Sequence, residues 1–249
     1  FREEMLAYLP NESNSLLFSM ALSYLGDCQR IFPSDSRPLE QVLWKIVTTN
    51  PVSQHRLQAF RLYRSIADSE EAVQRLYTLW QERKAPKDCT LSESDYIGLS
   101  YMLAMHLPEK ADKIIATQLS RIQNPDRKKE YQFISPSVSP RKAERDSVFA
   151  SLLIAGNRRV EPWASSALAN LNHRLREQES VAYIRLALEA MSEVQRTGDI
   201  FFPTAWVRSL LSAHTSKEAR EEVDAFFTAH PDFPLMLSNK IKQQASHLY

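Results

Sequence analysis

The six histidines are the side chains best suited to metal or acid–base chemistry, so their spacing is considered first. A zinc hydrolase of the H-E-x-x-H type places two histidines four residues apart on a helix, with a glutamate directly after the first as general base. No histidine of this chain has a glutamate after it. His173 lies four residues before Glu177 and His106 three before Glu109, but one such pair falls short of a zinc site. The sequence therefore predicts structural or solvated roles for its histidines, which are His55, His106, His173, His214, His230 and His247.

Nucleophilic and phosphate-binding motifs are also absent from the sequence. Cys28 and Cys89 have no glycine-rich or histidine-rich context that would single out a thiolate nucleophile. Two cysteines cannot build a disulfide framework, and free thiols are usually buried. There is no G-x-S-x-G elbow, and the four glycines stand alone, which excludes a glycine-rich phosphate loop. No catalytic residue and no metal ligand is predicted within this chain.

The sharpest polar candidates lie between Asn157 and Pro203. Arginine binds carboxylates through a planar fork, so an arginine in a turn can hold the carboxylate of a peptide or of a neighbouring domain. The residues that we single out as candidate substrate or interdomain contacts are Arg158, Arg159, Trp163, Arg196 and Asp199.

The turn that contains Asp199 is unusually apolar. Gly198 suits the left-handed position that often follows a helix, and an aspartate can accept hydrogen bonds from the backbone of its own turn. The next three side chains, Ile200, Phe201 and Phe202, are predicted to pack inward, because large apolar side chains dominate cores. The alternative is that part of this patch meets another domain.

The overall composition excludes several classes of protein. The net charge is +1, with 31 basic and 30 acidic residues, so nucleic acid is a poor candidate partner. No apolar run approaches the roughly 20 residues of a membrane span, and no secretory signal opens the chain. We expect a soluble protein, in the cytoplasm or in a bacterial periplasm or cell envelope. Because the sequence opens on Phe1 within a helical pattern, we also expect it to be part of a longer chain.

The elements that must position these residues are predicted to be helices. Apolar residues recur at i, i+3, i+4 and i+7 in Val73, Leu76, Tyr77 and Trp80, and a similar stripe runs from Val181 to Met191. Neither sustained alternation nor an Asn-Gly or Asp-Gly turn indicates a strand. The predicted helices span 12–31, 37–49, 51–67, 70–84, 92–106, 108–123, 125–134, 141–154, 160–172, 177–195, 203–213, 216–229 and 233–247.

This succession of short-linked amphipathic helices favours an all-α fold. Helix pairs that cannot bury their apolar faces alone stack into an α-solenoid of the armadillo or HEAT kind. The repeats are degenerate, and a compact all-α bundle is the alternative. We predict a single helical domain over 1–249, with possible lobes 1–135 and 141–249 on either side of a Ser/Pro bend at 135–140, where each X-Pro step disfavours helix.

Three stretches resemble a known domain. They are NPDRKKEYQFISP (124–136), NRRVEPWASSALANLNH (157–173) and VQRTGDIFFPTAWVRSLLSAHTSKEA (194–219). Their amino-acid sequences resemble the C-terminal helical domain of bacterial aminopeptidase N-like (gluzincin) zinc metallopeptidases. The likeness is best over the second half of the chain.

The resemblance implies a function without chemistry of its own. Such a domain covers the thermolysin-like zinc domain of its enzyme and shapes the cavity that admits peptide substrates. The zinc, the general base and the removal of N-terminal amino acids would belong to an upstream catalytic domain, the expected partner, so this chain needs no cofactor and is predicted inactive alone. The alternative function is a non-enzymatic α-solenoid scaffold that binds a protein.

Overall fold

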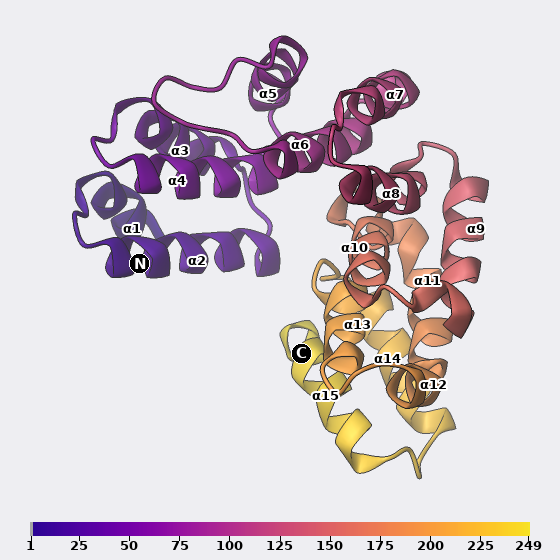
Figure 1. Ribbon diagram of the computed structural model, residues 1–249. Helices are drawn as coiled ribbons and strands as arrows, with labels where there is room; N and C mark the ends of the chain where they lie inside the picture. The colour runs from indigo at the N-terminus through magenta and orange to yellow at the C-terminus, as the bar shows by residue number, and fades with distance from the viewer. Residues whose placement is uncertain (1) are drawn as a thin grey trace. The chain divides into compact units, whose positions relative to one another are not determined.

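The structure, a computed structural model, describes residues 2–249 and is helical throughout (Figure 1). The described residues contain fifteen α-helices, six short 3₁₀-helices and no strand. Most connections are short, and the longest, 83–92, lies between α5 and α6. The all-α prediction is confirmed. The chain forms two compact units: unit 1 ends at Arg121, and unit 2 runs from Ile122 to Tyr249. None of the described helices combines the length and the apolar character that crossing a membrane requires.

Unit 1 contains seven α-helices, and neighbours in sequence pack on one another. Helix α3 packs on α4, α5 on α6 and α6 on α7, and α2 also packs on α4. The helices are α1 (Arg2–Tyr8), α2 (Ser15–Ile31), α3 (Arg37–Thr49), α4 (Ser53–Ile66), α5 (Glu70–Glu82), α6 (Glu93–His106) and α7 (Ala111–Arg121).

Side-chain caps fix where several of these helices begin. Asn14 accepts hydrogen bonds from the first amides of α2, and Ser69 does the same for α5. Ser92 and Asp95 form a capping box at α6, so that two otherwise unpaired backbone donors are satisfied. The helix predicted over 51–67 begins two residues later, at Ser53. Asn50 ends α3, and its side chain holds the turn that leads to α4.

The predicted apolar stripe of α5 forms part of the core of unit 1. Val73, Leu76 and Trp80 are buried. The Trp80 indole also donates a hydrogen bond of 2.8 Å to the buried Gln118 on α7. A buried indole N–H needs such a partner, since an unpaired one costs about 1–3 kcal/mol. This bond links α5 to α7 within unit 1.

Unit 2 contains eight α-helices around a continuous apolar core. Helix α10 packs on α13, α11 on α14, and α13 on α15. The helices are α8 (Pro125–Ile134), α9 (Lys142–Leu152), α10 (Glu161–Leu171), α11 (Glu177–Glu189), α12 (Met191–Thr197), α13 (Phe202–Leu211), α14 (Lys217–Ala229) and α15 (Leu235–Ala245).

A helix that the sequence predicts as continuous is divided into two in unit 2. The single helix expected over 177–195 is wrong, because α11 ends at Glu189 and α12 begins at Met191. The fully buried Trp206 of α13 donates its indole N–H to the carbonyl of Ala187 at 3.0 Å. The Ala187 carbonyl lies about one turn before the break. In an uninterrupted helix it would accept a hydrogen bond only from the backbone amide four residues later. The spacing of apolar residues along the sequence does not predict a hydrogen bond from a side chain on another helix.

The Ser/Pro segment 135–140 lies inside unit 2 rather than between the units, whose division is at 121/122. Residues Ser135–Val138 form a 3₁₀-helix that packs on α8, α9 and α10. Two arginines hold this segment, the buried Arg145 and the partly buried Arg176. Arg176 donates to the carbonyls of 137, 138 and 139 at 2.9–3.1 Å, and Arg145 donates to the last of these at 2.8 Å. Burial lowers the pKa of Arg176 to about 10, which leaves it charged at neutral pH.

Candidate functional site

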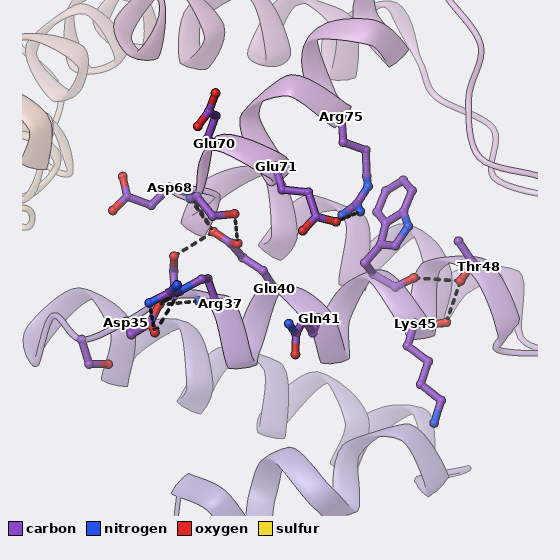
Figure 2. A pocket seen from close by; sticks show the side chains of 14 residues that line it. Asp35, Arg37, Glu40, Gln41, Lys45, Thr48, Asp68, Glu70, Glu71 and Arg75 are labelled. Atoms are coloured by element: carbon purple, nitrogen blue, oxygen red, sulfur yellow. Dashed lines mark hydrogen bonds and ion pairs between the residues drawn. The ribbon is translucent and has the colours of Figure 1, made fainter.

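A polar groove of about 760 Å³ lies in unit 1 between α3 and the start of α5 (Figure 2). Five carboxylates and three cationic side chains line it, together with one indole. The lining residues are Ser34, Asp35, Ser36, Arg37, Glu40, Gln41, Trp44, Lys45, Thr48, Asp68, Ser69, Glu70, Glu71 and Arg75. The sequence analysis singled out none of them, because α3 and α5 meet only through the tertiary fold.

Glu40 is the buried anchor of this groove. Its carboxylate accepts hydrogen bonds from the backbone amides of Asp68 and Ser69 at 2.8 and 3.1 Å, and from the hydroxyls of Ser36 and Ser69. Burial by itself would raise the pKa of Glu40, but these hydrogen bonds outweigh it and hold the pKa below its ordinary value. A negative charge at the first turn of α5 is also favoured by the helix dipole.

The opposite wall of the groove is aromatic and cationic. The Arg75 guanidinium lies 4.7 Å from the ring centre of Trp44 and donates a 2.9 Å hydrogen bond to the hydroxyl of Tyr63. It also pairs with Glu71. By contrast, the side chains of Lys45 and Glu70 make no hydrogen bond or ion pair with any described residue, so both are available to a ligand.

Several polar groups of the groove are already engaged with one another. It contains no histidine or cysteine. The hydroxyls of Ser36 and Ser69 donate to Glu40, whose lowered pKa makes it a weak general base. Across residues 2–249, no group of three or more His, Cys, Asp or Glu side chains is arranged to hold a metal ion.

Replacing Glu40 by Gln is expected to destabilise the protein by about 1 kcal/mol at pH 7, because the amide keeps one acceptor oxygen but loses the charge at the start of α5. Since the folded pKa of Glu40 is lowered, its contribution exists above the unfolded value and disappears as pH falls through the folded one. Urea unfolding of Glu40→Gln at pH 7 and pH 3 measures both effects. Glu70→Gln, at the same helix end but exposed, is the control; equal losses in the two variants would contradict the assignment.

The two neighbouring candidate arginines in unit 2 have opposite environments. Arg158 is 2% exposed; it donates to the carbonyl of Leu152 at 2.8 Å and to Glu193 at 2.9 Å. Its guanidinium also lies 5.6 Å from the ring centre of Trp206. Arg159 is exposed, and its side chain has no hydrogen bond or ion pair with a described residue. Arg158 is thus occupied within unit 2, and Arg159 is free to bind.

The next two candidates also differ in how far they are engaged. Trp163 is half-buried, with its ring centre 5.8 Å from that of Phe133. The Arg196 side chain is 75% exposed and reaches Glu193 only at 4.0 Å. Glu193 therefore lies close to both Arg158 and Arg196, whereas Arg159 is not brought to it.

Asp199 organises the turn before α13, as expected of an aspartate there. Its carboxylate accepts from the amides of Phe201 and Phe202 at 2.7 and 2.9 Å, and its own amide donates to Glu161 at 2.8 Å. Two expectations for this turn are wrong. Gly198 is extended, with φ −111°, rather than left-handed. Phe202 packs inward, but Ile200 and Phe201 face solvent, because the hydrogen bonds to Asp199 turn the backbone between them outward.

A buried polar cluster joins α10, α11 and the α13–α14 connection. His214 is fully buried, with Nε2 3.0 Å from the side-chain oxygen of Asn172 and Nδ1 3.8 Å from Glu177. Glu177 also accepts from the amides of Thr215 and Ser216 at 2.5 and 2.7 Å. Burial lowers the pKa of His214 to about 4, against the opposing effect of Glu177 and with a further lowering by His247. His214 is therefore a neutral structural residue at pH 7.

Comparison with known proteins adds no further constraint, since the chain matches no protein-family model and no curated protein is significantly similar to it.

Proposed function

We propose that this chain is the C-terminal helical domain of an aminopeptidase N-like zinc aminopeptidase. In this role the domain covers an upstream catalytic domain and shapes the cavity that admits peptides, with the helix pairs stacked as an α-solenoid. Zinc and the hydrolytic chemistry belong to the catalytic domain. This chain contributes the wall of the peptide cavity. It also contributes the exposed guanidinium groups of Arg159 and Arg196, which can donate hydrogen bonds.

The observation that supports the proposal most is how the three resembling stretches meet in unit 2. Stretch 124–136 meets stretch 157–173 through the rings of Phe133 and Trp163. Stretch 157–173 meets stretch 194–219 twice, where Glu161 accepts from the amide of Asp199 and where Asn172 meets His214. Polar and aromatic residues of the three resembling stretches therefore contact one another in the folded unit. Residues that stabilise the same fold are the ones that two related helical domains are expected to share, so these contacts support the resemblance.

The expected result for the chain alone is no turnover. With added zinc and an aminoacyl p-nitroanilide, the 249-residue chain should release no more product than buffer does. The full-length protein from the native gene should cleave the same substrate and lose that activity to a chelator. The reading frame should also encode H-E-x-x-H with a downstream glutamate upstream of this chain. Chelator-sensitive turnover by the chain alone, or a reading frame without that motif, would overturn the proposal.

The second candidate function is a protein-binding scaffold without an enzyme attached. The polar groove of unit 1 favours it, because Lys45 and Glu70 offer opposite charges without internal partners beside the half-buried Trp44. A native gene that lacks the zinc motif and a stable partner that is lost in a Lys45→Glu, Glu70→Lys variant would select this function over the first.

A further inference from the structure

A second groove, within unit 2, is lined mainly by apolar side chains. It encloses about 600 Å³ between α14, α15 and the connection that joins these two helices. Small-molecule sites are typically concave, measure about 300–1,000 Å³, and combine apolar and aromatic walls with a few polar groups. The size and the lining of this groove agree with that description, so its polar groups decide which ligand it suits.

Aromatic side chains form much of the wall of this groove. Phe227 of α14, Phe233 of the connection and Tyr249 all line it. Leu235, at the start of α15, lines it as well and is 72% exposed, so this part of the groove is open to solvent. The buried Val223 lies on the inner side. Because aromatic rings pack on one another by stacking or by edge-to-face contact, these walls suit a flat aromatic group.

The negative charge in the groove is balanced within the protein. Among the described lining residues, Asp224 supplies the one carboxylate side chain. One of its oxygens accepts a hydrogen bond from the Tyr249 hydroxyl, and the other lies 3.6 Å from the Arg220 guanidinium. Burial and the hydrogen bond to Asp224 raise the pKa of Tyr249 to about 12, so the phenol keeps its proton at neutral pH. Asp224 is therefore already engaged.

Two nitrogen-bearing side chains of the groove have no such partner. The Lys242 ammonium lies 5.4 Å from the ring centre of Phe227 and makes no hydrogen bond or ion pair with a described residue. The His230 ring packs against Phe233, and its nitrogens have no hydrogen-bond partner among the described residues. A carboxylate would give Lys242 a charge-assisted hydrogen bond, which is about twice as strong as a neutral one.

We propose that this groove binds a small aryl carboxylate, a free acid that carries one flat ring system. The ring packs between Phe227, Phe233 and Leu235, and the carboxylate accepts a hydrogen bond from Lys242. His230 is a second donor to the same group. A peptide that ends in an aromatic residue fits less well, because its backbone amides would find Asp224 already engaged. The inference does not depend on the aminopeptidase assignment.

The role of the charge is tested by calorimetric titration of the 249-residue chain with naphthylacetate and with naphthylethanol, which has a similar size but no charge. One naphthylacetate per chain is expected, with a Kd at least about tenfold lower than that of the alcohol. Lys242→Met should raise the Kd of the acid to that of the alcohol and leave the alcohol unchanged. Lys113→Met, at an exposed position on α7 of unit 1, is the matched control and should change neither Kd.

The apolar wall is tested with two neighbouring positions. Leu235→Ala should raise the Kd of both ligands about fivefold, since it removes part of the wall. Met236→Ala should change neither, because Met236 is 71% exposed but does not line the groove. Far-UV circular dichroism checks that the variants fold.

Several results would overturn the proposal. They are no binding of naphthylacetate up to its solubility limit, equal Kd values for the acid and the alcohol, and a Lys242→Met variant that still prefers the acid. Equal effects of Leu235→Ala and Met236→Ala would overturn it too, as would a phenylalanine-terminated peptide that binds more tightly than naphthylacetate.

Discussion

Replacing Arg158 by alanine is expected to destabilise the protein by about 2–3 kcal/mol, while the same change at Arg159 should cost less than about 0.5 kcal/mol. Arg158 is the more costly because its removal leaves a cavity beside Trp206 and a buried carbonyl of Leu152 without its donor. Glu193 contributes less to the loss, since it is partly exposed and can be hydrated.

Urea unfolding of the two variants in parallel measures the difference, and Arg158→Lys refines it. Lysine keeps the charge but lacks the planar fork, so it should recover only part of the stability. Equal losses at positions 158 and 159 would contradict the structural role of Arg158. In activity assays of the full-length aminopeptidase that we propose, a defect of Arg158→Ala should accompany unfolding, whereas a defect of Arg159→Ala should not.

Acid is expected to destabilise the protein through His214 by about 3 kcal/mol between pH 7.5 and pH 4. The pKa of His214 is about 4 in the folded protein, against about 6.5 for an unfolded chain. Between these values the unfolded state binds a proton that the folded state excludes, so stability falls as pH falls. The cost arises because a protonated imidazole would be buried, with only Glu177 nearby to compensate and His247 opposing it.

The measurement is the free energy of unfolding from urea titrations between pH 7.5 and 4. His214→Asn should be less stable at pH 7.5 but should lose less stability on acidification than the original chain. His230→Gln, at an exposed position, should keep the original slope. If His214→Asn kept the original slope as well, another group would be the source of the acid sensitivity.

The helical class could be predicted from local features because helices are set by local rules. Stripes such as Val73, Leu76 and Trp80 mark the face that a helix buries, and Asn124 marks the start of α8 by capping its first amides. Both are properties of a few consecutive residues. They suffice to place most elements and to exclude strands.

The candidate sites could be predicted much less well. The sequence offers Arg158 and Arg159 as equals, and only the tertiary contacts of Arg158 with Leu152, Glu193 and Trp206 distinguish the buried one from the free one. The groove of unit 1 needs Glu40 to meet the start of α5, a contact across 28 residues. The outward direction of Ile200 and Phe201 depends on the hydrogen bonds of one turn. None of these three contacts can be predicted from the spacing of residues along the sequence.

The arginine clamp on segment 135–140 limits which substitutions the chain can accept there. The two terminal nitrogens of Arg176 reach three successive carbonyl oxygens at once, a geometry that depends on a flat, forked cation. A lysine would bring the same charge as a single point that cannot span all three. Position 176 should therefore reject lysine even though the exchange preserves charge. The Ser/Pro segment is restricted as well, because Ser137 and Val138 are fully buried and the Ser137 hydroxyl is hydrogen-bonded to Ile134 and Asn170.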